Sequence, residues 1–222
     1  MLQFRPMEKN SNPSNRFTST LLKVVWLSIL LGLGMEILLL LASVGFGKIP
    51  ALKVIIADLV QKVSWASFVC IGVAIGTVIA RGRSSIIGLA GFISAPLAFH
   101  IARVLHKSTV QALAITGPAA SMPSPLILAL IKAVEYACLG YFIGFIRRKS
   151  SAGIGAHTLV GALTGIIFGG TILFLAITQT AGSIPVFTLV ARALNEIIFP
   201  VGCAWVLFAA EHFKARVETS QD

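Results

Sequence analysis

Charged residues are scarce in this chain of 222 residues: Asp, Glu, Lys and Arg together make up 12% of it, and hydrophobic residues make up 56%. Ordinary soluble domains carry about 25% charged residues. A chain with half that fraction lacks the polar surface that a soluble fold of this size needs, and its mean hydropathy is +0.91. The composition excludes an ordinary soluble domain and predicts an all-α, polytopic integral membrane protein.

Aspartate and cysteine are also rare. The two aspartates, Asp58 and Asp222, both fall outside the predicted spans, which excludes a two-aspartate intramembrane protease and an Asp-rich, metal-dependent lipid enzyme. The three cysteines, Cys70, Cys138 and Cys203, lie singly in apolar runs without a CxxC pair. They are interpreted as small core residues, because neither a disulfide framework nor a zinc site has this pattern.

Motifs for enzymatic chemistry are missing. The chain contains no GxxxxGK[ST], GxGxxG, HExxH or GxSxG, and its four histidines do not cluster. We therefore expect no enzyme, no metal and no cofactor, with an enzyme built from Glu and His on separate helices as the alternative. The net charge of +10 comes from Lys and Arg beside apolar runs, without a basic stripe interleaved with aromatics. This pattern predicts contact with membrane lipids and excludes nucleic acid as a partner.

Six apolar runs are long enough to cross a bilayer, which takes about 20 residues each. They cover about 21–46, 63–80, 85–105, 125–146, 157–178 and 184–208. The six-helix domain is placed at 19–212, between an N-terminal cytosolic tail at 1–18, expected to be mobile, and a C-terminal cytosolic tail at 213–222.

The basic residues of the loops predict the orientation. With the N-terminus in the cytoplasm, inner segments hold eleven Lys and Arg, and outer loops hold four: Lys48, Lys53, Lys62 and Lys107. This excess predicts that both termini are cytoplasmic, which an even number of spans requires. The expected location is a bacterial plasma (inner) membrane or another internal membrane.

Two outer connections have alternatives. Residues 49–62 form either a short helix on the outer surface or an early start of the second span. Residues 108–125 contain Gly117-Pro118, Pro123 and Pro125, which exclude a regular helix and leave an ordinary loop or a re-entrant segment.

Spans two and three resemble spans four and five. Cys70, Gly72, Ile75 and Gly76 align without a gap with Cys138, Gly140, Ile143 and Gly144. This suggests a same-direction internal repeat, with chance resemblance as the alternative. The GxxxG spacings within it, and the glycines of the fifth span (Gly161, Gly165, Gly169 and Gly170), predict close helix packing within the monomer, and dimerisation is the alternative.

Ionisable residues interrupt four of the spans. In the sixth span, Arg192, Glu196, Pro200 and Cys203 share one helical stripe, and Asn195 lies beside it. Arg192 and Glu196 have the spacing of an ion pair, and Pro200 deprives the Glu196 carbonyl of its helical donor.

The fourth span contributes Lys132 and Glu135, which are three residues apart and can pair as in the sixth span, with Tyr136 beside them. The first span contributes Glu36 near small residues, and the third contributes His100 with Arg103. The spans together hold equal numbers of opposite charges: three carboxylates (Glu36, Glu135 and Glu196) and three fixed cations (Arg103, Lys132 and Arg192). An ion facing lipid at mid-depth costs from about 2.5 to over 10 kcal/mol, so these groups are expected to turn inward and meet, or to line a watery cavity.

Two functions account for such a layer. We predict a small transporter, channel or substrate-binding membrane subunit for a small polar or ionic solute. The expected protein partners are other membrane subunits or further copies of this chain. The alternative is a non-catalytic assembly or scaffold protein whose buried charges are structural. The predicted site residues are Glu36, His100, Arg103, Lys132, Glu135, Arg192, Asn195 and Glu196, with His100 and Arg103 at its mouth.

Overall fold

The computed structural model describes residues 13–80, 83–116, 124–148, 153–179 and 184–219, and these form six helices. All six are long and apolar enough to cross a membrane, which confirms the all-helical class and the six candidate spans. Their bounds are α1 Pro13–Gly45, α2 Leu52–Ile79, α3 Ser84–Ala112, α4 Pro125–Ile146, α5 Ile154–Gln179 and α6 Val186–Thr219.

The helices are longer than most of the predicted spans. Helix α2 runs without interruption from Leu52, so residues 52–62 are the early start of the second span and not a separate surface helix. Lys62, predicted in an outer loop, therefore lies within α2, and so does Asp58, predicted outside the spans. Helices α1 and α6 extend into both predicted tails. Residues 108–112, predicted to belong to an irregular connection, instead continue α3, and Pro125 is the first residue of α4. The loop alternatives at Gly117, Pro118 and Pro123 concern positions outside the described residues.

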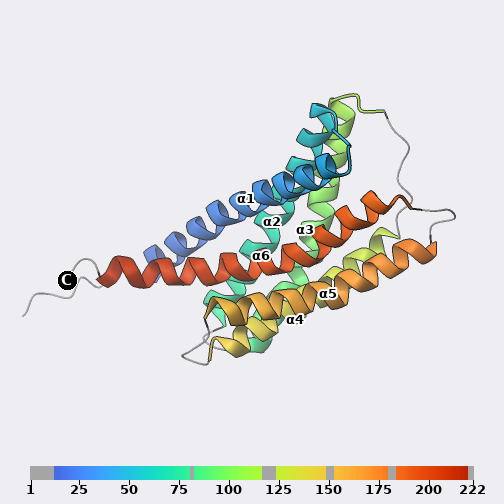
Figure 1. Cartoon of the computed structure of the whole chain (residues 1–222). Helices are drawn as coiled ribbons and strands as arrows, with labels where there is room; N and C mark the ends of the chain where they lie inside the picture. The colour runs from blue at the N-terminus through green and yellow to red at the C-terminus, as the bar shows by residue number, and fades with distance from the viewer. Residues whose placement is uncertain (1–12, 81–82, 117–123, 149–152, 180–183, 220–222) are drawn as a thin grey trace, which may run out of the picture.

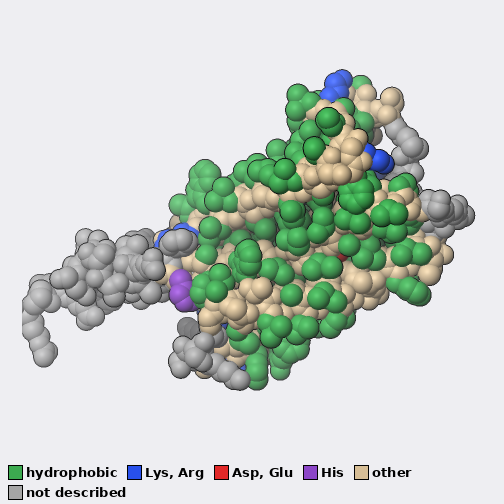
Figure 2. Space-filling view, viewed as in Figure 1, with side chains coloured by type: hydrophobic (Ala, Val, Ile, Leu, Met, Phe, Trp, Pro, Cys, Tyr) green, Lys and Arg blue, Asp and Glu red, His purple; other side chains and the backbone are tan. Residues whose placement is uncertain are grey.

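Both ends of the helical bundle's chain lie at the same end of the bundle. In Figure 1, α1 begins beside the place where α6 ends, and the connections alternate between the two ends of the molecule. Hydrophobic side chains cover the flank in Figure 2, and Lys and Arg are visible towards the ends. This arrangement suits a bundle in hydrocarbon, while the assignment of one end to the cytoplasm stays a prediction.

Glycines seat α3 between α2 and α4. A Cβ added to Gly72 would lie 2.1 Å from the Cβ of Ser94 on α3, and one added to Gly140 would lie 2.6 Å from the carbonyl oxygen of Ile87 on α3. From α3 itself, a Cβ on Gly91 would lie 2.1 Å from the carbonyl oxygen of Tyr136. The prediction of helix packing within the monomer is confirmed at these positions. The internal repeat stays a prediction, although the matched Gly72 and Gly140 both contact α3.

Helix α5 lies against α6 in the same way. Added Cβ atoms on Gly161, Gly165 and Gly169 would lie within 2.6–2.8 Å of α6 atoms, the last of them the Cβ of Glu196. Gly170 differs from the prediction, because nothing lies within 4 Å of its added Cβ. The core is completed by Cys70 and Cys203, both free and buried, whose Sγ atoms are 3.2 Å apart across α2 and α6.

Candidate functional site

All six helices line one cavity of about 390 Å³ in the described part of the chain. Four of the predicted site residues line it: Lys132 from α4, and Arg192, Asn195 and Glu196 from α6. Counting along the helices places it in one half of the bundle, since Lys132 follows the start of α4 by about two helical turns and Glu196 follows the start of α6 by about three. By the predicted orientation, this is the outer half.

A triad of charged side chains forms one side of the cavity. Lys132 Nζ donates to Glu135 Oε2 at 2.7 Å and also to Glu196 Oε2. We call Lys132, Glu135 and Glu196 the triad. The Glu135 side chain is 0% exposed and does not line the cavity, whereas the Glu196 side chain is 12% exposed and lines it. The spacing of Lys132 and Glu135, three residues apart on α4, predicted their contact, and it is confirmed.

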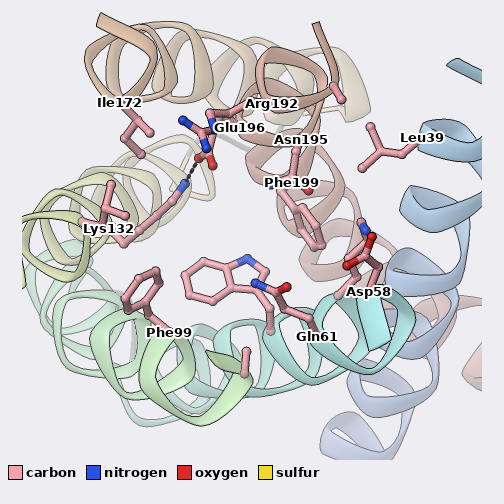
Figure 3. Close-up of a pocket in the computed structure, with 15 residues that line it drawn as sticks. Leu39, Asp58, Gln61, Phe99, Lys132, Ile172, Arg192, Asn195, Glu196 and Phe199 are labelled. Atoms are coloured by element: carbon pink, nitrogen blue, oxygen red, sulfur yellow. Dashed lines mark hydrogen bonds and ion pairs between the residues drawn. The ribbon is translucent and has the colours of Figure 1, made fainter. Parts of the chain in front are cut away.

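Local packing explains why Glu196 reaches across to α4. Gly169 of α5 lies so close to Glu196 that a side chain there would collide with its Cβ. Helix α5 therefore packs against this part of α6, and the rest of the Glu196 side chain extends to Lys132 of α4. The predicted partner along the helix, Arg192, lines the same side of the cavity beside Glu196 (Figure 3).

A second group of charges lies across the cavity. In Figure 3, Asp58 and Gln61 of α2 lie on the opposite side of the cavity from Lys132, Arg192 and Glu196. Asp58 Oδ1 contacts His106 Nε2 of α3 at 3.2 Å. We call Glu36, Asp58, Lys62 and His106 the outer cluster.

Glu36 belongs to this outer cluster. Its Oε2 accepts a hydrogen bond from Lys62 Nζ at 2.6 Å. A Cβ on Gly32, one turn before Glu36, would lie 2.6 Å from Cα of Val63, so α1 and α2 touch just where this pair forms. The sequence predicted three cations for the three carboxylates and did not include Lys62, because residue 62 was placed in a loop.

The predicted inward turn of the carboxylates is confirmed. Glu36 is 5% exposed and Glu135 is fully buried, and Glu196 is largely covered. The predicted mouth residues are placed elsewhere: His100 is exposed next to the ring of Phe99, and Arg103 is partly buried. Phe99 and Ala102 are the α3 residues that line the cavity, so His100 and Arg103 stand on neighbouring faces of α3.

Aromatic side chains line the middle of the cavity. Trp65, Phe99 and Phe199 belong to its wall, and the Trp65 ring meets Phe99 edge-on at 6.5 Å. Lys132 Nζ lies 5.8 Å from the Trp65 ring centre, which is within the range of a cation–π contact. The wall therefore has an aromatic middle between two polar sides.

Sequence reasoning missed the α2 wall. Asp58, Gln61, Lys62 and Trp65 have the i, i+3, i+4, i+7 spacing of one helical face. The apolar residues of the same segment also lie on one face, and such an amphipathic pattern is equally typical of a helix on the membrane surface. Had residue 58 been assigned to a span, its carboxylate would have been an expected site residue.

Comparison with known proteins gives no further information on this site. The chain matches no protein-family model, no curated protein and no solved structure. Among the described residues, no group of three or more His, Cys, Asp or Glu side chains could hold a metal ion. The geometry offers hydrogen-bond donors and acceptors of both charges around an aromatic wall, which suits reversible binding of a small molecule.

Proposed function

We propose that this integral membrane protein is a small transporter, channel or substrate-binding membrane subunit that holds a small polar or ionic solute in the cavity. The observation that carries the proposal is the position of the charges. Lys62, Lys132, Arg192, Asp58 and Glu196 all line one cavity within a bundle whose flank is apolar.

The size of the cavity supports binding of a solute. Ion pairs that only fix helix positions need no space between them, whereas about 390 Å³ lies between these side chains. Ligand pockets fall in the range of about 300–1,000 Å³. Polar groups on both sides and aromatic rings between them suit a small solute with polar groups at two ends.

Asn195 provides a test that leaves every observed ion pair in place. It lines the cavity and is uncharged, so Asn195→Leu fills part of the space and removes an amide without changing a charge. Gly170→Ala is the matched control, because its added Cβ meets nothing within 4 Å. Purified protein would first be screened against small metabolites for a rise in melting temperature, since a bound solute stabilises the folded state by mass action.

The proposal predicts that the stabilising metabolite no longer raises the melting temperature of Asn195→Leu, while Gly170→Ala responds like the original protein. Uptake of the same compound into reconstituted vesicles should fail in parallel. An equal response of both variants would contradict a solute site in this cavity.

A scaffold role is the second candidate, and one observation favours it. The ion pairs join different helices, Glu36–Lys62 across α1 and α2 and Lys132–Glu196 across α4 and α6, as structural bridges do. A scaffold would keep its cellular function in Asn195→Leu, because the bridges remain. Loss of that function in a variant that folds and assembles normally would exclude the scaffold role.

A further inference from the structure

The triad contains more acceptor charge than donor charge. Two carboxylates, Glu135 and Glu196, share the single ammonium group of Lys132. When both carboxylates are ionised, the three groups carry one net negative charge. The outer cluster differs, because Glu36 there has Lys62 as its own partner.

Two buried polar atoms lie unsatisfied at the triad. Among the described side chains, Glu135 Oε1 and the Tyr136 hydroxyl are buried and make no hydrogen bond. Both residues are 0% exposed. A buried carboxylate oxygen without a donor is costly, whereas a protonated carboxyl group carries no charge and can donate as well as accept.

The charged and titratable groups around Glu135 come from three helices. Lys132 and Tyr136 lie with it on α4, and Glu196 lies on α6, while the thiols of Cys203 on α6 and Cys70 on α2 lie near Tyr136. Arg192 also lines the cavity, next to Glu196. Because Glu196 lines the cavity beside Arg192 and Glu135 does not, the charge of Glu135 is balanced mainly by the shared ammonium group of Lys132.

We propose that Glu135 is a proton-binding site coupled to the cavity. Lys132 Nζ, which donates to Glu135 Oε2, gives its proton to that oxygen, and a hydronium ion of the cavity water protonates Nζ again and leaves as neutral water. No other bond changes. Lys132 then has one ionised partner, Glu196, and the triad becomes neutral. The occupancy of Glu135 thereby sets how Lys132, a residue of the cavity wall, is held.

This inference rests on the proposed function only for its consequence, which is that the proton would be the ion coupled to solute binding. The ammonium group at the centre of the triad disfavours Na⁺ or another metal cation, since like charges repel at contact distance. A proton, by contrast, requires only an oxygen lone pair. The chemistry therefore selects the proton as the ligand.

Infrared difference spectroscopy tests proton binding without any solute. Purified protein in lipid would be titrated from about pH 9 to about pH 5, a range that brackets perturbed carboxyl groups. The proposal predicts a carbonyl-stretch band of a protonated carboxyl group that is lost in Glu135→Gln. The same band should remain in Glu36→Gln, which removes a buried carboxylate from the outer cluster.

A second variant keeps the test informative where Glu135→Gln does not fold. Glu135→Asp retains the carboxyl group on a shorter side chain, so the band should shift in frequency. A band that persists unchanged in Glu135→Gln or Glu135→Asp, or no such band in the original protein, would overturn the proposal. The band needs no bound solute, so a failed metabolite screen would count against the proposed function and leave this site standing.

Discussion

The triad and the outer cluster differ in how their carboxylates are paired with basic groups. In the outer cluster, each carboxylate has its own partner, Glu36 with Lys62 and Asp58 with His106. In the triad, two carboxylates share Lys132. Exposure differs as well, since the Asp58 side chain is 40% exposed and the Glu135 side chain is fully buried.

This difference indicates that the outer cluster has a structural role and the triad a functional one. The Glu36–Lys62 pair is electrically neutral as a whole and can serve as a bridge between helices. In the triad, Glu135 Oε1 is buried without a donor. This lowers the stability of the folded state, and helix packing alone does not require it. Strained electrostatics of this kind in a membrane interior is typical of sites that bind an ion or a solute.

The largest expected effect comes from removing the shared cation. Lys132→Met leaves Glu135 and Glu196 without their ammonium partner, and breaking a buried pair costs about 3–5 kcal/mol. We expect a large fall in the melting temperature in detergent, or no folded protein. Lys62→Met is the matched control in the outer cluster and should cost less, towards the lower end of the range of about 3–5 kcal/mol, because it leaves one carboxylate without a partner instead of two.

Equal losses of melting temperature in the two lysine variants would remove the distinction between the triad and the outer cluster. A double variant, Lys132→Met with Glu135→Gln, sharpens it further. It removes the most deeply buried acid together with the cation, so it should recover part of the stability lost in Lys132→Met.

The second prediction concerns the packing of α3 against α4, the helix that carries Lys132 and Glu135 of the triad. Gly91→Ala places a Cβ about 2 Å from the backbone carbonyl of Tyr136, next to Glu135, so α3 and α4 must separate. Overpacking of this kind costs about 1–3 kcal/mol. Thermal denaturation should show the loss, and Gly34→Ala, whose Cβ meets nothing within 4 Å, should melt like the original protein. A Gly91→Ala protein with unchanged melting would contradict the close α3–α4 contact.

The smallest effect is expected in the exposed part of the outer cluster. Asp58→Asn removes the charge from a contact in which both side chains are 30–40% exposed. Such pairs contribute less than about 1 kcal/mol, and salt screens them. The melting temperature should fall slightly at low salt and not at all at high salt. A loss as large as that of Lys62→Met would show that Asp58 is structurally more important than its exposure indicates.

Physical cost made part of this site predictable from the sequence. The expense of an ion in hydrocarbon predicted that Glu36, Glu135 and Glu196 turn inward, and helical spacing predicted the Lys132–Glu135 contact. Both depend on one helix and its solvent. The small residues at 161, 165 and 169 likewise predicted a close helix contact of the fifth span, and the structure shows that its partner there is α6.

Partners on different helices were beyond such reasoning. Glu36 pairs with Lys62 because α1 and α2 cross at Gly32 and Val63, and a single sequence does not give the position of a crossing. His100 and Arg103 were assigned to the site from their depth alone. The rotation of α3, set by Gly91 against α4, directs Phe99 and Ala102 to the cavity instead.

Accessibility of the cavity to water from outside the membrane tests the account most directly. Asn195→Cys would be made in a background with the three native cysteines replaced by alanine, beside Ile167→Cys on the exposed face of α5 as the lipid-facing control. A membrane-impermeant maleimide, which reacts with hydrated thiolates, would then be added to intact cells. The account predicts rapid labelling of the cysteine at position 195 and slow labelling of that at 167. Equal, slow labelling at both positions would contradict a hydrated cavity that receives a solute.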